Sequence, residues 1–247
     1  MEKTKRILKE ILSTLEADSD VSDISTCVYW TAVTSLRCGL ASTMAASLMH
    51  QQGHQVEAAG HLLPTRAKAL AELCLSDHIL EAAIGIAAIN SILPLDESRY
   101  VDLNAEEEIG TRGEGKRIAI IGHFPFVKRI RNIADKLWVF ELPGRERPGD
   151  ITGDEIETLL PQADVVAISS TTLINHTLGG ILDHVAPDAY KMMLGPSTPL
   201  SPVLFDHGMD TISGSIVTDR DKVLRCISQG ANFRQVEGIR KVIMVRN

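Results

Sequence analysis

Polar and small residues follow four apolar runs of this chain, and their chemistry could serve a site. Gly122-His-Phe-Pro125 follows the first run, Glu141 ends the second, Ser169-Ser-Thr-Thr172 follows the third and Gly195-Pro-Ser-Thr-Pro199 follows the fourth. An imidazole can move a proton or bind a metal, and hydroxyls can bind an anionic or oxygen-rich ligand. These four segments are therefore the candidate ligand contacts.

The first segment departs from the pattern of a dinucleotide site. Such a site carries G-x-G-x-x-G after its first strand, so that a diphosphate can approach the backbone. Here Gly122 is followed by His123, Phe124 and Pro125, which fill that space and remove one amide donor. This argues against NAD or FAD bound in the usual manner. His123 is the one histidine at a predicted strand end, which makes it the best candidate for an acid, a base or a ligand, although a structural role is open too.

Glu141 lies nineteen positions after Gly122, where dinucleotide-binding folds place the carboxylate that holds ribose hydroxyls. A carboxylate at that place could equally hold an amine or a metal, or simply face solvent. The sequence contains no C-x-x-C or H-E-x-x-H pattern that would indicate a known metal site. Glu141 and His123 are therefore the two candidates for a metal ligand.

Hydroxyl groups gather where the third run ends. Ser170, Thr171 and Thr172 lie at a predicted strand-to-helix turn, and Asn175 is expected in the first turn of that helix. One hydroxyl is enough to cap a helix, so the others are free to face a ligand. The Asn175 amide offers both a donor and an acceptor.

The fourth segment is a rigid turn. Gly195 and Pro196 precede Ser197 and Thr198, and Pro199 follows them. Such rigidity suits a preorganised site, and a purely structural turn explains it as well.

The apolar runs predict the elements that must position these residues. We predict buried strands at residues 117–121, 137–141, 164–169, 190–194 and 241–245. The segments between them are long enough for the crossover helices that parallel strands require. The fold class is therefore α/β with a mostly parallel sheet. In such a sheet ligands bind beyond the carboxyl ends of the strands, where the four segments lie.

The first hundred residues predict a smaller α+β unit. Its expected elements are a helix at 3–17, two antiparallel strands within 24–44, a short strand near 55–59, a helix from Pro64 and a helix at 77–92. The Arg37 side chain would project from these strands, either into solvent at the edge of the sheet or toward a ligand. Asn90 would either cap its helix or face a cleft. Residues 94–116 have the composition of a linker, which predicts domains at 1–103 and 104–247.

Composition limits the partners of the chain. The formal charge of −7 and the isoelectric point near 5.6 argue against nucleic-acid binding. No run reaches the ~18 apolar residues of a membrane span, and the first residues lack the apolar core of a signal peptide. We expect a cytoplasmic protein, and a homodimer on base rates alone.

Several of these segments together resemble one family. The chain resembles the putative heavy-metal chelation family, long described as a domain of unknown function, at residues 121–125 (IGHFP), 140–141 (FE), 163–178 (ADVVAISSTTLINHTL) and 194–200 (LGPSTPL). Residues 39–43 and 84–90 look like the first domain of that family. The resemblance implies an enolase amino-terminal-like domain, then a Rossmann-like domain, with a proposed site between them.

The leading hypothesis is that the interdomain crevice binds a small polar or anionic ligand, a class that includes a heavy metal or a metal-chelating compound. An enzyme of transferase type, which uses a nucleoside-like cofactor or substrate in the same crevice, is the alternative. A third hypothesis is an assembly protein whose crevice is vestigial. The residues expected to line the crevice are Gly122, His123, Phe124, Pro125, Glu141, Ser170, Thr171, Thr172, Asn175, Gly195, Pro196, Ser197 and Thr198, with Arg37 and Asn90 from the first domain.

Overall fold

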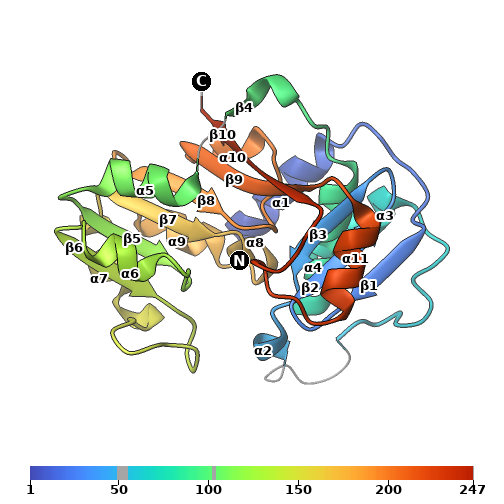
Figure 1. Ribbon diagram of the computed structural model, residues 1–247, viewed down its shortest axis with the longest axis horizontal. Helices are drawn as coiled ribbons and strands as arrows, with labels where there is room; N and C mark the ends of the chain where they lie inside the picture. Colours follow the sequence, from blue (N-terminus) through green and yellow to red (C-terminus); the bar gives the residue numbers. More distant parts are fainter. Residues whose placement is uncertain (49–54, 102–103, 247) are drawn as a thin grey trace.

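The chain folds into an α/β structure with one large and one small sheet (Figure 1). The computed structural model describes residues 1–48, 55–101 and 104–246. The large sheet has seven strands and is mostly parallel, and the small sheet has three antiparallel strands. The predicted fold class is confirmed.

The large sheet has the order β4-β10-β9-β8-β7-β5-β6. Its strands are β4 (Tyr100–Val101), β5 (Arg117–Ile121), β6 (Lys136–Phe140), β7 (Val165–Ser169), β8 (Tyr190–Leu194), β9 (Thr211–Val217) and β10 (Ile239–Val245). The five strands from β5 to β9 are parallel and follow the 2-1-3-4-5 order of a doubly wound fold. β10 runs antiparallel to both β9 and β4, so the expectation that it continues the parallel series is wrong.

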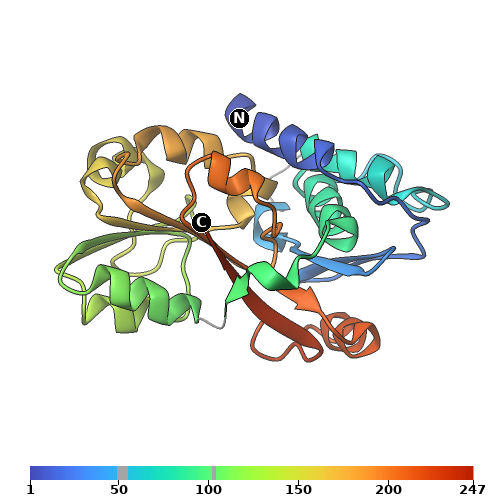
Figure 2. The same cartoon turned by 90° about the horizontal axis from the view of Figure 1, so that it is seen from above.

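The parallel strands are buried because helices cover both faces of the sheet (Figure 2). Ile118 and Ile120 pack with residues of α5 (Ala105–Gly113) and α6 (Val127–Arg131). Ala119 and Ile121 point to the other face, where α1 (Glu2–Ser13), α9 (Leu178–His184) and α10 (Val203–Asp206) lie. α7 (Ile156–Leu159) lies between the 3-10 turns Gly153–Glu155 and Leu160–Gln162, and α8 (Thr171–Ile174) is a single turn.

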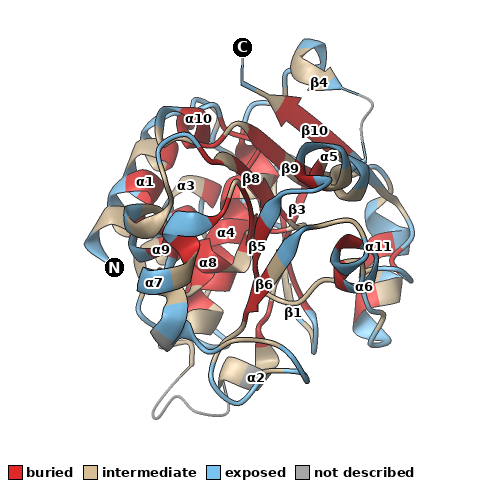
Figure 3. Ribbon diagram, turned by 90° about the vertical axis from the view of Figure 1, so that its left-hand side faces the viewer, coloured by how far each residue is buried: buried red, intermediate tan, exposed pale blue. Residues whose placement is uncertain are grey.

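The small sheet contains β1 (Asp23–Thr26), β2 (Trp30–Thr34) and β3 (Cys38–Ser42). The sequence predicts two strands here, and the structure has three because a turn at 27–29 divides the first of them. The sheet packs on α4 (Ile79–Ile92), whose side chains are buried almost all round (Figure 3). α2 (Ala45–Leu48) follows β3, and α3 (Ala67–Ala71) with the 3-10 turn Glu72–Leu75 precedes α4.

Three further expectations for this half differ from the structure. Residues 55–59 form turns rather than a strand, and α3 begins three residues after Pro64. The segment 94–116 contains the 3-10 turn Glu97–Arg99, β4 and α5, and β4 joins the large sheet by pairing with β10. The division at 103 and 104 remains a prediction. α11 (Arg220–Ser228) begins after Asp219, whose side chain accepts a hydrogen bond from Lys222 N.

His176 joins three parts of the fold. Its backbone adopts the left-handed conformation, with φ of 56°, between α8 and α9. The ring is 2% exposed, and its Nε2 donates to Cys74 O at 2.8 Å. Thr4 Oγ1 in α1 donates to His176 O at 3.0 Å. Burial lowers the pKa of His176; the hydrogen bond to Cys74 O opposes this shift, and Lys5 acts in the same direction as burial.

The lowered pKa of His176 predicts how stability depends on pH. The unfolded chain binds a proton to this ring near its ordinary pKa of 6.5, whereas the folded chain resists that proton. The free energy of unfolding should therefore be fully retained above about pH 6.5 and should fall as the pH drops below that value. Urea unfolding at a series of pH values measures this. His176→Asn tolerates the left-handed backbone and removes the titrating group, so an equally steep acid loss in that variant would contradict the assignment.

Candidate functional site

A pocket of about 500 Å³ lies beyond the carboxyl ends of β5, β6 and β7. β6 and β7 lie on opposite sides of β5, so the strand order reverses at this point. Doubly wound folds bind ligands at such a switch point. The turn between β1 and β2, the end of β3 and residues 232–233 form the other walls of the pocket.

The turn after β5 brings Gly122, His123 and Phe124 to the pocket. Gly122 has φ of 93°, which favours glycine, and a Cβ there would lie 3.1 Å from the side chain of Ser169. Pro125, by contrast, is exposed and does not line the pocket.

A buried carboxylate orients His123. The imidazole Nδ1 donates to Asp150 Oδ2 at 2.8 Å, and no other described residue hydrogen-bonds the ring. The His123 side chain is 16% exposed, and that of Asp150 is 1% exposed. Because Nδ1 donates to a carboxylate, Nε2 is the ring nitrogen left without a hydrogen-bond partner among the described residues.

Asp150 reaches His123 because the loop after β6 folds back along that strand. Ile151 N donates to Val139 O at 2.7 Å, and Glu141 N donates to Ile151 O at 3.1 Å. Arg147 N donates to Asp150 Oδ2 at 3.0 Å, which further fixes the carboxylate. Sequence reasoning missed Asp150, because residues 142–155 carry many charged residues, glycines and prolines with no periodic signal.

The carboxylate of Glu141 is held by backbone amides at the end of β6. Leu142 N donates to Oε1 at 2.9 Å and His123 N donates to Oε2 at 3.2 Å. Each oxygen keeps a lone pair that can accept from a ligand. Glu141 lines the pocket beside His123, so the structure brings these two predicted residues together.

The segment after β7 supplies hydroxyl and amide groups. Thr171, Thr172 and Asn175 line the pocket together with Ser169. Ser169 Oγ and Thr171 Oγ1 lie 2.8 Å apart, and Thr172 Oγ1 donates to Ser169 O at 2.7 Å. Asn175 follows α8 instead of falling in its first turn, and its Oδ1 accepts from Thr177 Oγ1 at 2.7 Å.

The remaining predicted residues of this half lie behind the pocket. Ser170 is buried against Gly195, and its Oγ has no hydrogen-bond partner among the described residues. Gly195 and Pro196 form the turn after β8, and neither lines the pocket. Ser197 is fully buried, and its Oγ accepts from Ser42 N at 2.8 Å. Ser197 therefore fixes the end of β3, which lines the pocket through Ser42.

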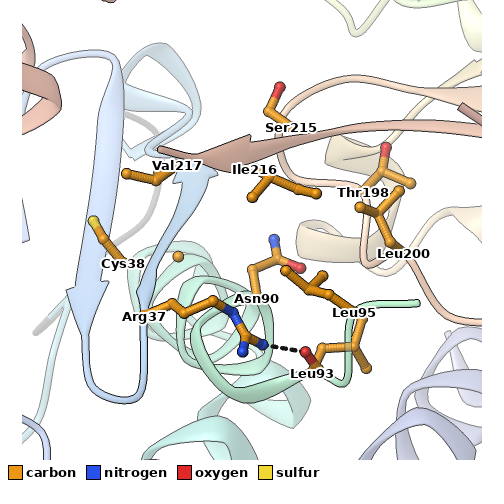
Figure 4. Close-up of a pocket in the computed structure, with 11 residues that line it drawn as sticks. Arg37, Cys38, Asn90, Leu93, Leu95, Thr198, Leu200, Ser215, Ile216 and Val217 are labelled. Carbon is orange, nitrogen blue, oxygen red and sulfur yellow. Dashed lines mark hydrogen bonds between the residues drawn. The ribbon is translucent and has the colours of Figure 1, made fainter. Parts of the chain in front are cut away.

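Arg37, Asn90 and Thr198 surround a separate cavity of about 20 Å³, room for about one water (Figure 4). The Arg37 guanidinium donates to Leu93 O, and burial lowers its pKa. Asn90 Nδ2 donates to Leu40 O at 2.9 Å, which joins α4 to β3. This cavity shares no residue with the large pocket.

The described residues contain no group of three or more His, Cys, Asp and Glu side chains that could hold a metal ion. The pocket contains two side chains of these types, His123 and Glu141. None of the helices described in the structure has the length and apolar character needed to cross a membrane.

Comparisons with known proteins agree with this architecture. Residues 107–246 match a family model described as "Putative heavy-metal chelation", and residues 8–93 match a second model with the same description. An uncharacterized protein of Methanocaldococcus jannaschii is 30% identical over 173 residues, which are 66% of this chain and 65% of that protein, slightly less than two thirds of its length.

Two crystal structures of proteins with unknown function share the fold. The protein from Desulfitobacterium hafniense has a TM-score of 0.83 and 24% identity, covering 100% of this chain and 99% of that chain. The protein from Pyrococcus horikoshii has a TM-score of 0.81 and 24% identity, covering 98% of this chain and 99% of that chain. Both belong to the family of the first model. Because that model alone matches more than half of the chain, the protein belongs to the family described as "Putative heavy-metal chelation".

Proposed function

We propose that the protein binds a small metal-chelating compound, with or without its metal, in the pocket beyond β5, β6 and β7. The observation that carries the proposal is the imidazole of His123, a residue that lines the pocket: its Nδ1 is held by Asp150 at 2.8 Å, and its Nε2 has no hydrogen-bond partner among the described residues. Histidines that bind metals in proteins commonly donate their other ring nitrogen to a carboxylate in this way. The description of the family supports the same chemistry.

The number of protein donors favours a chelate over a bare ion. His123 and Glu141 supply two donor side chains, and metal sites in proteins commonly need three or four from the chain. The pocket volume of about 500 Å³ is also that of a small molecule rather than an ion. A compound that brings its own donors would complete the coordination, with His123 or Glu141 taking an open position. Arg145 lines the pocket and can neutralise an anionic chelator.

One observation favours an enzyme as the second candidate. Glu141 lies at the end of β6, next to the switch point, where related topologies hold ribose hydroxyls. A nucleoside-like cofactor or substrate bound there would lie beside His123, whose imidazole is the candidate acid or base and is oriented by Asp150. A transferase-type reaction would use those groups.

Native mass spectrometry with elemental analysis, on protein purified without chelators or added metal, tests the proposal. We expect a stoichiometric metal or metal–organic mass that is lost in His123→Ala and in Glu141→Ala. His184→Ala removes a histidine outside the pocket and should keep that mass. A nucleoside-like mass without metal would support the enzyme instead. Protein free of any bound mass, which also binds no metal chelate on titration, would contradict the proposal.

A further inference from the structure

Aromatic side chains are concentrated in the large pocket. The chain has only ten aromatic residues, and five of them line this pocket. They are Tyr29, Trp30, Phe124, Phe140 and Phe233. A site for a small hydrophilic ion would not need them, because aromatic faces bind by apolar contact and ring stacking.

Phe124 offers a fixed ring face in the pocket. Its ring stacks on Phe126, with centroids 5.1 Å apart and an interplanar angle of 7°. Phe126 does not line the pocket, so it supports Phe124 from outside it. Phe124 also follows His123 directly, which places the ring close to the polar groups of the site. A flat ring bound against Phe124 would extend an existing stack at little cost in side-chain entropy.

Apolar side chains from distant parts of the chain complete the aromatic part of the pocket. Val28 and Tyr29, in the turn before β2, are 59% and 53% exposed, and both line the pocket. Phe233 lies against Trp30 with centroids 5.6 Å apart, and Trp30 Nε1 donates to Ala231 O at 2.9 Å. Exposed apolar groups at the rim of a pocket are those that a bound apolar surface would cover.

The polar end of the pocket adds a second requirement. Both oxygens of Glu141 already accept a backbone amide, and their remaining lone pairs can accept from donors of a ligand. A diphosphate is disfavoured there, because Phe124 lines the pocket in the turn after β5, where a glycine-rich cradle would be. The ligand should therefore bring hydroxyl or amino groups instead of phosphates to Glu141.

We propose that the ligand of this pocket carries a flat aromatic ring that stacks on Phe124 and, next to the ring, hydroxyl or amino groups that donate to Glu141. This inference adds the chemical class of the ligand to the proposed function. It rests on one part of that function, namely that the pocket binds a small molecule. Two compound classes share this chemistry: a nucleoside, and a hydroxylated aromatic chelator of the catechol type. The first corresponds to the enzyme candidate and the second to the chelate candidate.

Calorimetric titration of the full chain with four probes tests the inference. The probes are adenosine and 2,3-dihydroxybenzoate, which carry a ring, and ribose and citrate, which do not. The catechol and citrate are each used alone and with Fe³⁺. We expect one aromatic probe to bind at least about tenfold more tightly than its ringless counterpart, since stacking on one aromatic face contributes about that factor. Which aromatic probe binds identifies the class.

Variants assign the effect to the residues. Phe124→Leu should weaken binding of the aromatic probe about tenfold, and Glu141→Gln should weaken it as well. Phe205→Leu removes a ring outside the pocket and should leave binding unchanged, which controls for general loosening of the core. Circular dichroism confirms that each variant is folded.

The outcomes separate this inference from the proposed function. Binding of ferric citrate with equal or greater affinity than the aromatic probes would overturn the aromatic ligand while keeping chelate binding. Failure of all four probes at millimolar concentration would overturn the inference. The proposed function would fall with it only if the purified protein also carries no metal or organic mass. Unchanged affinity in Phe124→Leu would equally overturn the stacking role.

Discussion

Substituting Gly85 by alanine should destabilise the protein by about 3 kcal/mol or more. Gly85 lies in α4, where this helix packs against the 3-10 turn at 72–75. A Cβ at Gly85 would stand 1.9 Å from Cys74 N and 2.6 Å from Cys74 Cα. These are backbone atoms, which cannot rotate away, so the helix or the turn would have to move. Because α4 is central to the core, such a shift would disturb most of its neighbours.

The measurement is the free energy of unfolding by urea, or the soluble yield if the variant does not fold. Gly180→Ala is the matched control, since Gly180 also lies in a helix and its Cβ would meet nothing within 4 Å. That change should be neutral or stabilise the protein by up to about 1 kcal/mol, through the higher helix propensity of alanine. Equal stability of the two variants would mean that α4 and the turn do not approach this closely.

Parallel strands could be predicted closely from the sequence because they are buried on both faces. Such a strand is a continuous apolar run, and residues 117–121 and 190–194 were predicted with the bounds that the structure has. Strand direction is not encoded in apolarity, which is why β10 was expected to run parallel. The division of the first strand at 27–29 was missed because Val28 and Tyr29 are apolar yet exposed.

The candidate site was predictable to the extent that topology dictates it. The ends of β5, β6 and β7 must meet at one edge of the sheet, so His123, Glu141 and Thr171 come together. Periodicity does not show which surface of a hairpin or helix packs against the sheet. The sequence therefore did not reveal that Arg37 and Asn90 lie at a second cavity. Asp150 and Phe233 reach the pocket region through long loops, and such contacts depend on tertiary packing that local sequence does not specify.

Replacing Asp150 by asparagine should weaken binding of a metal chelate about 10- to 100-fold, if His123 is its ligand. The carboxylate of Asp150 is buried and accepts from both His123 Nδ1 and Arg147 N. A neutral amide is a weaker acceptor for Nδ1–H, so the orientation and the tautomer of the His123 ring become less fixed. Titration with a ferric chelate measures the affinity, and ¹⁵N chemical shifts of the ring report which nitrogen carries the proton.

Asp135→Asn provides the control for charge. Asp135 is exposed just before β6, at the far end of that strand from Glu141, so the same change of charge should leave affinity unaltered. The Asp150→Asn variant should also unfold within a few degrees of the wild-type transition temperature, because the asparagine side chain has nearly the same volume as the aspartate side chain. A variant that keeps both the wild-type affinity and the Nδ1 proton would show that Asp150 does not position His123. If affinity is retained while the proton moves to Nε2, the lone pair of Nε2 is not needed, and Glu141 would become the residue that holds the metal.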